Sequence, residues 1–394
     1  MARFSIIRSS GVDIVLDLYQ ERTEIRNDLF AGKRPKRVPV YPAFTIEAAC
    51  GLAGISLIDA HYDTELAAKA HEKICETFYS DCMASANFRF PPVYQLLGAK
   101  NWILASNGTV QHPEIETMYA EDYDEFIENP YDVIIEKFLP RVCAALDTDP
   151  INRGIVFAKA FEEYVHQTSA NYSTIKLLSK RYGYTAGTIA GPQTEAPFDF
   201  LADQLRGFKA ILLDCRRIQD KVEAACKAIL PYMVKLAIPA HRYPGIQGLV
   251  PLHMAPYMNP QQFERLWWPT FEEMIVELDK QGIGMTIFAE NDWTRFLDHL
   301  TRLPKSTLVW AEDGDMKLYT ETFGKDHIFG GFFDPTITLS KTKEECIDVV
   351  KEMCDICMKS DHFYFTFNKG VMDIKSVDVP KLQAVLEWVR DNAH

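Results

Sequence analysis

The sequence predicts an α/β protein built on a single (β/α)8 TIM barrel with a helical extension at its N-terminus. In its second half, helical and strand-like segments alternate with a repeat of about 20–35 residues, as in parallel βα units. The chain contains neither a Gly-rich dinucleotide fingerprint nor a GxxxxGK[ST] phosphate loop, which disfavours a nucleotide-binding open sheet. No Pro-rich or Ser/Gly-rich linker divides the 394 residues. We therefore expect one domain over residues 1–394.

The second half of the chain supplies the clearest elements. Short apolar runs bounded by turn residues predict strands, and apolar residues spaced three or four apart predict helices. The expected strands are residues 249–254, 284–289, 307–311, 327–332 and 362–367, and the expected helices are residues 259–280, 293–303, 317–323, 342–359 and 380–392.

The first half is less regular, and its pattern predicts fewer elements. Residues 89–150 are rich in Pro, Tyr and Asp and give no clear period. The expected elements are a helix over 14–31 within an N-terminal extension (1–37), a strand over 38–42, a helix over 67–83, a strand over 185–192 that ends in a loop, and helical sequence from there to about residue 236.

Composition and charge limit the classes of partner. Apolar residues make up 47% of the chain and charged residues 25%, a normal globular balance. Lys and Arg number 42 against 55 Asp and Glu, and the net charge of −13 argues against binding to nucleic acid or to an anionic membrane. No apolar run reaches the roughly 18 residues of a membrane span, and the N-terminus does not resemble a signal peptide. The sequence predicts a soluble, cytoplasmic protein.

The nine cysteines do not form a disulfide framework, because their number is odd and their spacing irregular. Cys354 and Cys357 form a C-x-x-C, but with Cys346 they lie on the apolar face of the expected helix 342–359. A redox or zinc C-x-x-C is usually found at a helix start or tight turn. We therefore expect these cysteines to be core residues.

Acidic residues follow several expected strands, at the end where the active site of a barrel lies. Glu290 and Asp292 follow strand 284–289, and Glu312 follows strand 307–311. Asp commonly caps the next helix, and this alternative applies to Asp292 and equally to Asp315 and Asp334. Glu is a poorer cap, so Glu290 and Glu312 are the main catalytic candidates, with Asp292 as a third.

Six short segments occur in an order that is found in one known superfamily. They are KRPKRVPVYP (33–42), LGA (97–99), GTIAGPQTEA (187–196), NPQQFERLWWPTFEEMI (259–275), GGFFDP (330–335) and FNKGVMDIKSVDVPKLQAVLEWV (367–389). Each is unspecific alone, but together the segments resemble the uroporphyrinogen decarboxylase (URO-D) superfamily along most of the chain. Within it, the chain is most similar to the corrinoid-dependent methyltransferases of O-demethylase systems.

Departures from the superfamily pattern narrow the expected activity. True uroporphyrinogen decarboxylases carry arginines after the first strand, whereas residues 38–63 contain none and offer aromatic side chains instead. Thiol methyltransferases bind zinc through an H-x-C motif and a later Cys, but the matching positions hold Phe288-Ala289-Glu290 and Gly370. Decarboxylation and zinc-dependent methylation of a thiol such as coenzyme M are therefore the alternatives, and both are disfavoured. A third alternative is a barrel that binds a ligand without catalysis. The acids at the strand ends disfavour this alternative.

The resemblance implies a methyltransferase that demethylates a small methoxylated, preferably methoxyaromatic, substrate. The methyl group would pass to cob(I)alamin on a separate corrinoid protein, because this chain has no corrinoid-binding D-x-H-x-x-G segment. We expect the substrate to contact Tyr41, Phe44, His61, Tyr62, Tyr257, Trp293, Phe333 and Asn368.

The resemblance also suggests a zinc ion. Glu312 follows Glu290 by 22 positions, the interval between two zinc ligands in methyltransferases of the cobalamin-independent methionine synthase type. His253, at the end of strand 249–254, is the candidate third ligand, although a lone His on an apolar strand can equally be a core residue. Such a site would polarise an ether oxygen.

Overall fold

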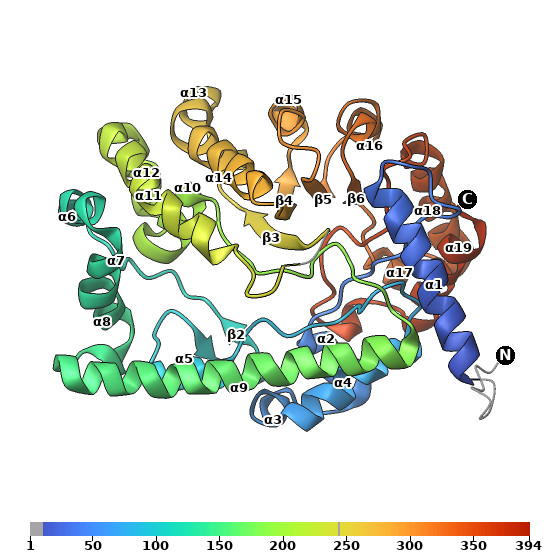
Figure 1. Ribbon diagram of the computed structural model, residues 1–394, viewed down its shortest axis with the longest axis horizontal. Helices are drawn as coiled ribbons and strands as arrows, with labels where there is room; N and C mark the ends of the chain where they lie inside the picture. Colours follow the sequence, from blue (N-terminus) through green and yellow to red (C-terminus); the bar gives the residue numbers. More distant parts are fainter. Residues whose placement is uncertain (1–10, 243–244) are drawn as a thin grey trace.

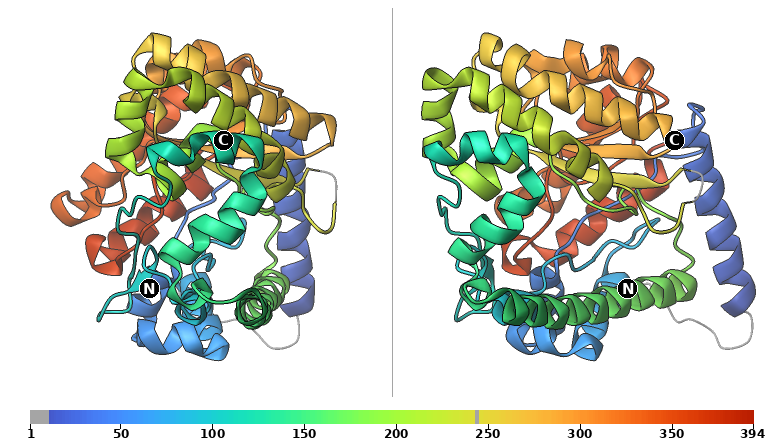
Figure 2. Two further views of the ribbon diagram at one scale, coloured as in Figure 1. Left: turned by 90° about the vertical axis from the view of Figure 1, so that its left-hand side faces the viewer. Right: turned by 60° about the vertical axis from the view of Figure 1, so that its left-hand side comes forward.

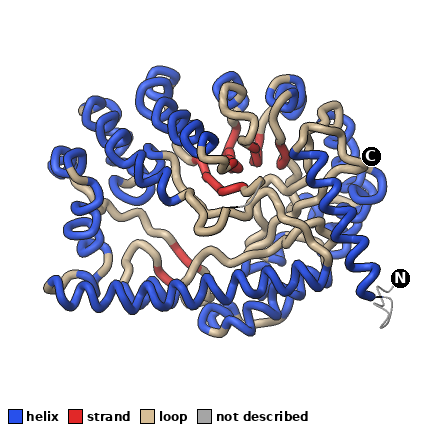
Figure 3. Tube along the Cα trace, in the orientation of Figure 1, coloured by secondary structure: helices blue, strands red, loops and turns tan. Residues whose placement is uncertain are grey.

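The computed structural model describes residues 11–242 and 245–394 and has a mixed α/β fold around a parallel sheet (Figure 1). The sheet holds four parallel strands in sequence order, and Figure 3 shows them side by side. They are β3 (Gln247–Leu252), β4 (Gly284–Asp292), β5 (Leu308–Asp313) and β6 (Phe329–Gly331). All four lie where the apolar runs of the sequence predict strands.

Helical segments connect these strands or follow β6, and those between the strands cover one side of the sheet (Figure 1). Most agree in position with the sequence prediction, although several are divided into shorter pieces, and two short segments, at 337–340 and 374–376, were not predicted. The helical segments are α13 (Pro260–Gln262), η6 (Phe263–Trp267), α14 (Trp268–Lys280), η7 (Thr294–Phe296), α15 (Leu297–Leu300), α16 (Met316–Glu321), η8 (Phe323–Lys325), α17 (Ile337–Ser340), α18 (Lys343–Cys357), η9 (Ile374–Ser376) and α19 (Val379–Asn392).

Four more segments run parallel to the sheet but pair with it only through isolated bridges. Residues 38–44 pair with residues 80–85 and 363–371, residues 80–85 pair with 185, and residue 193 pairs with β3. β6 pairs with residue 363, and residue 333, just after β6, pairs with residue 367. Pro39 and Pro42 have no N–H to donate, which prevents a continuous ladder in the first segment. The parallel sheet is thus confirmed, whereas the complete eight-stranded barrel stays a prediction.

The first half of the chain is mainly helical. It contains α1 (Gly11–Phe30), α2 (Ile46–Ala53), α3 (Leu57–Tyr62), α4 (Thr64–Thr77), α5 (Pro91–Leu97), the antiparallel pair β1 (Ile103–Leu104) and β2 (Val110–Gln111), η1 (Ala120–Asp122), α6 (Tyr123–Glu128), α7 (Pro130–Val133), η2 (Ile134–Phe138), α8 (Leu139–Val142) and η3 (Ala144–Leu146). The long helix α9 (Pro150–Tyr182) follows, and then α10 (Pro197–Phe200), η4 (Leu201–Arg206), α11 (Phe208–Arg217) and α12 (Gln219–Leu236).

Sequence reasoning missed α9, the 33-residue helix that crosses the lower side of Figure 1. Its ends carry clear signals, since Asp149 caps its N-terminus and Gly183 ends it with a φ of 65°. Its apolar stripe is weak, because only Ala160, Gln167 and Leu178 are buried. A helix that is largely exposed has little apolar period to detect.

The expected core cysteines are confirmed as core residues. All nine cysteines are buried and free, and burial raises the pKa of Cys354 and of Cys357 to about 12. Both lie within α18, away from its start. In the described residues, no helix is long and apolar enough to cross a membrane.

A buried ion cluster attaches α1 to the rest of the fold. Figure 2 shows α1 at one edge of the molecule, beside the end of α9. Arg22 on α1 donates to the backbone carbonyls of Tyr182 and Gly183 at that end, at 2.6 and 3.0 Å, and lies 3.3 Å from Asp81. Arg37 binds Asp81 at 2.7 Å. Burial opposes ionisation of Asp81, but the hydrogen bonds and positive charges of its partners outweigh it and lower its pKa.

We expect Asp81→Asn to lower the free energy of unfolding by about 3–5 kcal/mol, because it leaves Arg22 buried without a counter-charge and Arg37 with only the partly exposed Glu21. Denaturant unfolding followed by circular dichroism measures this loss. Asp361→Asn is the control, since the Arg34–Asp361 pair is about half exposed and its loss costs at most about 1 kcal/mol. An equal loss of unfolding free energy in the two variants would contradict the role of Asp81 as the buried counter-charge.

Candidate active site

The candidate active site is an imidazole held between two carboxylates at the C-terminal ends of β3 and β4. His253 follows β3, and its Nδ1 lies 2.5 Å from Oδ2 of Asp203. Its Nε2 lies 3.0 Å from Oε1 of Glu290, near the end of β4. The His253 and Glu290 side chains keep 38% and 32% of their surface exposed, so a ligand can reach both. His253 and Glu290 were predicted from the sequence, whereas Asp203 was not.

Asp203 reaches His253 from a helical segment that is wound more widely than an α-helix. It lies in η4, a π-helical stretch between α10 and α11. Such stretches are frequent at functional sites, because the extra residue in the turn redirects a side chain. No sequence period reveals a π-turn, and Asp203 is 50 positions from His253. The sequence signal for Asp203 was therefore absent.

The end of β4 is irregular, and this irregularity positions Glu290. The β4–β5 register shifts between Ala289 and Asp292, and Asn291 has a left-handed φ of 62°. Bulges of this kind redirect side chains beside active sites. The backbone N–H of Asn291 donates to Oε2 of Glu312 at 2.9 Å, which holds the bulge in place.

Glu312 takes part in holding the bulge and does not contact His253. Its Oε1 accepts a hydrogen bond from Nζ of Lys369 at 2.8 Å. Burial alone would raise the pKa of Glu312, but the bonds from Lys369 and Asn291 lower it, so Glu312 is ionised. Sequence reasoning grouped Glu290 with Glu312; the structure instead gives them separate partners.

The two carboxylates keep His253 protonated. Partial burial lowers the pKa of its imidazole, but the hydrogen bonds and charges of Asp203 and Glu290 outweigh burial and raise this pKa to about 11. A histidine without such partners titrates near 6.5. At neutral pH the centre of the site is therefore an imidazolium ion with a carboxylate on each side.

Two further acids lie behind this group. Asp199 is fully buried; its Oδ2 accepts from the backbone N–H of His253 at 2.8 Å and its Oδ1 from Nε1 of Trp267 at 2.7 Å. Oε1 of Glu195 accepts from Gln204 at 3.0 Å, while its Oε2 has no partner among the described residues. Burial, followed by the charge of Asp203, raises the pKa of both acids to about 7. Near neutral pH both acids are therefore partly protonated.

The Asp residues at the strand ends accept hydrogen bonds from nearby backbone N–H groups, and one of them, Asp315, is a helix cap, the alternative left open by the sequence. Oδ1 of Asp292 accepts from the backbone N–H of Thr294 at 2.8 Å. Asp315 caps α16 through the N–H of Leu318 at 3.0 Å, and Asp334 accepts from the N–H of Thr336 at 2.9 Å. Within the described chain, no hydrogen bond connects Asp292 to His253.

Four of the expected substrate-binding aromatics are core residues. Trp293 is fully buried against Trp267, with ring centroids 5.5 Å apart, and its Nε1 donates to the backbone carbonyl of Glu290. Tyr41, Phe44 and Phe333 are also buried. Packing their large apolar faces in the core removes surface from water, so these four rings are closed to solvent, and their contact with a ligand stays a prediction.

The other expected contact residues have partners of their own. His61 is buried, with Nε2 2.8 Å from the carbonyl of Gly108, and Tyr62 is exposed and donates to Gln95. Tyr257 is exposed and meets Phe208 edge-on at 5.4 Å. The side chain of Asn368 accepts from the backbone N–H of Lys369. No hydrogen bond joins any of these four side chains to His253 in the part of the chain that the structure describes.

The expected zinc ligands do not converge. His253 and Glu290 lie together, but Glu312 is bound to Lys369 and Asn291. In residues 11–242 and 245–394, no group of three or more His, Cys, Asp and Glu side chains is placed to hold a metal ion. The donor set thus matches two of the three predicted ligands, and we derive no step through zinc.

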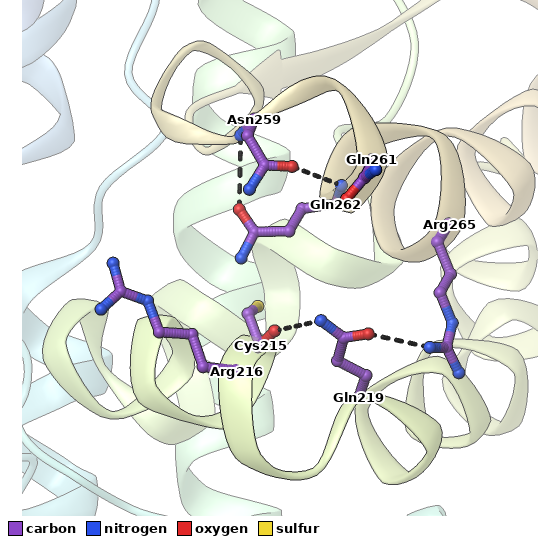
Figure 4. A pocket seen from close by; sticks show the side chains of 7 residues that line it. All are labelled: Cys215, Arg216, Gln219, Asn259, Gln261, Gln262 and Arg265. Atoms are coloured by element: carbon purple, nitrogen blue, oxygen red, sulfur yellow. Dashed lines mark hydrogen bonds between the residues drawn. The ribbon is translucent and has the colours of Figure 1, made fainter.

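A separate cavity of about 480 Å³ lies outside the sheet, between α11, α12 and the start of α13 (Figure 4). Gln219 joins two of its walls, because its side chain donates to the carbonyl of Cys215 and accepts from Arg265. Asn259 and Gln262 bind each other across the first turn of α13. None of the acids around His253 lines this cavity, so it is distinct from the candidate active site.

Comparison with known proteins identifies the family. Residues 156–392, more than half of the chain, match the family described as uroporphyrinogen decarboxylase (URO-D). The chain belongs to the uroporphyrinogen decarboxylase family. This confirms the resemblance drawn from the short motifs. The family match includes β3–β6, Asp203, His253 and Glu290.

A solved structure has the same fold. It is a methyltransferase from Methanosarcina mazei, with a TM-score of 0.59 and 14% sequence identity over 95% of this chain and 98% of that chain. At this identity the likeness shows the fold alone. No curated protein sequence matches the chain.

The buried acid Glu195 predicts how stability depends on pH. A carboxyl group whose pKa rises on folding stabilises the fold fully below its unfolded pKa, here about 4.5, and this contribution is lost as the pH rises through the folded pKa of about 7. Relative to Glu195→Gln, the wild-type free energy of unfolding should therefore fall by about 1–3 kcal/mol between pH 4.5 and 7.5.

Denaturant unfolding at several pH values measures this difference. Glu128→Gln, at an exposed position on α6, is the matched control and should differ from the wild type by a constant amount. A constant difference for Glu195→Gln as well would contradict the raised pKa.

Proposed function

We propose that the protein is a methyltransferase that demethylates a small methoxyaromatic compound and passes the methyl group to a corrinoid on a separate protein. The observation that carries this proposal is the protonated His253, held by Asp203 and Glu290 and open to solvent. Family membership and the fold shared with a methyltransferase support it. The parallel bridges around the sheet also support a closed eight-stranded barrel, with this site at its C-terminal end.

An aryl methyl ether needs an acid for this reaction, because phenolate is a poor leaving group. Nε2 of His253 would give its proton to the ether oxygen as the carbon–oxygen bond breaks, and both electrons of that bond would stay on oxygen. The reduced corrinoid, when bound, supplies the nucleophile that takes the methyl group. The products are a phenol and the methylated corrinoid.

The residues around His253 would hold and restore its proton. Asp203 keeps the imidazole oriented through Nδ1, and Glu290 holds the Nε2 proton until an ether oxygen replaces it. Once His253 has given up this proton, Glu195 and Asp199 are the nearby reserve, because their pKa values of about 7 leave them partly protonated at neutral pH. The cycle then returns to the imidazolium form.

A zinc ion at this site is a separate proposal. Nε2 of His253 and a carboxylate oxygen of Glu290 would bind it, with Asp203 orienting the imidazole from Nδ1. When bound there, the ion would supply Lewis acidity, and the mechanism proposed above does not depend on it. Metal analysis of the purified protein tests this: His253→Gln and Glu290→Gln should both lower zinc content, whereas Glu312→Gln should not.

The site supports the alternative reactions less well. A uroporphyrinogen decarboxylase needs cationic side chains for a substrate with many carboxylates, whereas Glu195, Asp199, Asp203 and Glu290 surround His253. A zinc thiol methyltransferase needs cysteine ligands. All nine cysteines are buried and free, and none belongs to a group of three or more possible metal ligands in the described chain. A site that only binds a ligand does not require a protonated imidazole between two acids.

Methyl transfer can be measured directly from the corrinoid spectrum. With a reduced corrinoid protein and a panel of methoxybenzenes, the wild type should form methylcob(III)alamin and release the phenol. His253→Gln should slow this step by about 100-fold or more, because it removes the acid. Asp315→Asn, which alters only the cap of α16, should retain the wild-type rate.

Two results would contradict this proposal. Failure of methoxyaromatics, methanol and methylamines alike to methylate the cobalt would exclude methyl transfer. A wild-type rate in His253→Gln would keep the reaction but remove His253 as its acid.

A further inference from the structure

The cavity between α11, α12 and the start of α13 is a second place where a small molecule can bind. Its volume of about 480 Å³ is in the range of small-molecule sites. In Figure 4, Cys215 and Gln219 line one wall, and Asn259 and Gln262 line the wall opposite. No carboxylate belongs to the described lining, although the whole chain has a net charge of −13. The lining itself therefore does not repel an anion.

The two amide side chains on the α13 wall turn their nitrogen atoms toward the cavity. Oδ1 of Asn259 accepts from the backbone N–H of Gln262 at 2.9 Å, and Oε1 of Gln262 accepts from the backbone N–H of Asn259 at 3.3 Å. This capping box fixes the direction of both amide groups, because their oxygens are bound to the helix start. Their NH2 groups are left to face the gap, as Figure 4 shows. A ligand therefore meets two fixed donors on this wall.

The opposite wall brings no negative charge to the cavity. Nε2 of Gln219 donates to the carbonyl of Cys215 at 2.7 Å, and its Oε1 accepts from Arg265 at 2.8 Å, so both ends of this amide are used. Burial raises the pKa of the Cys215 thiol to about 12, and the thiol is therefore neutral at physiological pH. Neither side chain competes with an anion for the donors of the α13 wall.

Arg216, near the end of α11, supplies a positive charge at the edge of the cavity. It is exposed, and among the described residues its guanidinium has neither an ion pair nor a hydrogen bond (Figure 4). Arg265, the other arginine of the lining, is instead bound by Glu223 at 3.1 Å and by Asp220. In the described lining, Arg216 is thus the cation whose donors are open to a ligand.

We propose that this cavity binds a phosphate group, as the free ion or on a small molecule, through Arg216 and the amide nitrogens of Asn259 and Gln262. The proposal does not depend on the proposed methyl transfer. A tetrahedral phosphate presents oxygens to donors on different walls, whereas a planar carboxylate presents only two. Hydrogen bonds to a charged acceptor are the stronger ones, and a guanidinium matches the geometry of phosphate. The remaining volume leaves room for an organic group.

A bound phosphate would join two separate segments of the chain. Arg216 lies on α11, which follows η4 and Asp203, whereas α13 begins seven positions after His253. A ligand that binds both segments stabilises them relative to states in which they separate. Backbone amide exchange should therefore slow in residues 208–217 and 259–267 when the site is filled.

Calorimetry with inorganic phosphate and with glycerol 3-phosphate, at constant ionic strength, tests the site. We expect the wild type to bind one molecule per chain of at least one of these probes, and to bind acetate at least tenfold more weakly. Arg216→Gln should weaken phosphate binding by about tenfold or more, because it removes the charged donor. Hydrogen-exchange mass spectrometry with the same probes should show slower exchange in residues 208–217 and 259–267.

Gln262→Glu tests the α13 wall without removing the helix cap. A glutamate keeps an oxygen for the backbone N–H of Asn259, as in the usual capping box, but replaces the NH2 group with a negatively charged oxygen. This variant should lose phosphate binding and remain folded, which thermal unfolding measures. Unchanged phosphate affinity in Gln262→Glu would overturn the proposed site.

Two variants are matched controls. Arg217→Gln removes an exposed arginine next to Arg216 that does not line the cavity. Gln20→Glu makes the same charge change as Gln262→Glu, but at an exposed position on α1, on the opposite side of the molecule in Figure 1. Both controls should bind the probes as the wild type does.

The outcomes decide both the site and the form of its ligand. Tighter binding of glycerol 3-phosphate would support the site with an organic phosphate as its ligand, and equal or tighter binding of inorganic phosphate would support it with the free ion. Absence of binding by both probes would overturn the proposal. So would equal losses in Arg216→Gln and Arg217→Gln, or slower exchange only outside the two segments.

Discussion

The imidazole of His253 has a carboxylate at each ring nitrogen, and the ends of β3 and β4 are built to keep it there. Asp199 holds the backbone N–H of His253 and is itself held by Trp267. On the other side, Glu312 and Lys369 fix the bulge at Asn291, directly after Glu290. Residues that do not touch the imidazole thus determine its position and its charge. Such supporting contacts are needed because a catalytic group must be held in place before the substrate arrives.

The same arrangement explains why so many acids can share one small region. Four carboxyl groups surround His253, and full ionisation of all four would strongly disfavour the fold. The positive charge on His253 lies between two of them and offsets one negative charge, and burial lets Glu195 and Asp199 keep protons up to about pH 7. The site therefore combines a strong hydrogen-bond donor with a local supply of protons. This combination suits a reaction in which a poor leaving group must be protonated.

Part of this account could be predicted from the sequence. The apolar runs located β3–β6, and the rule that barrel sites lie at strand ends selected His253 and Glu290. Asp203 could not be found in this way, because a π-helical turn brings it to His253 from 50 positions away. Glu312 was predicted at the correct strand end. Its role in supporting the bulge depends on its contact with the backbone N–H of Asn291, for which the sequence has no signal.

The aromatic residues show a second limit of sequence reasoning. Trp293 and Phe333 follow strands and were expected to face a ligand, yet both are buried in the core. Trp102 and His112 lie in residues 89–150, where the pattern gave no element, and their stacked rings stay at least partly exposed. Position relative to a strand predicts where a residue lies along the fold. Whether its ring faces the core or solvent depends on the loops packed over it.

The protonation state of His253 tests the central claim most directly. In protein labelled with 15N-histidine, the spectrum of His253→Gln assigns the His253 ring nitrogens. The account predicts that both nitrogens carry protons at pH 8, because the pKa is raised to about 11, and that Asp203→Asn lowers this pKa. A neutral imidazole at pH 8, titrating near 6.5 in both proteins, would contradict it.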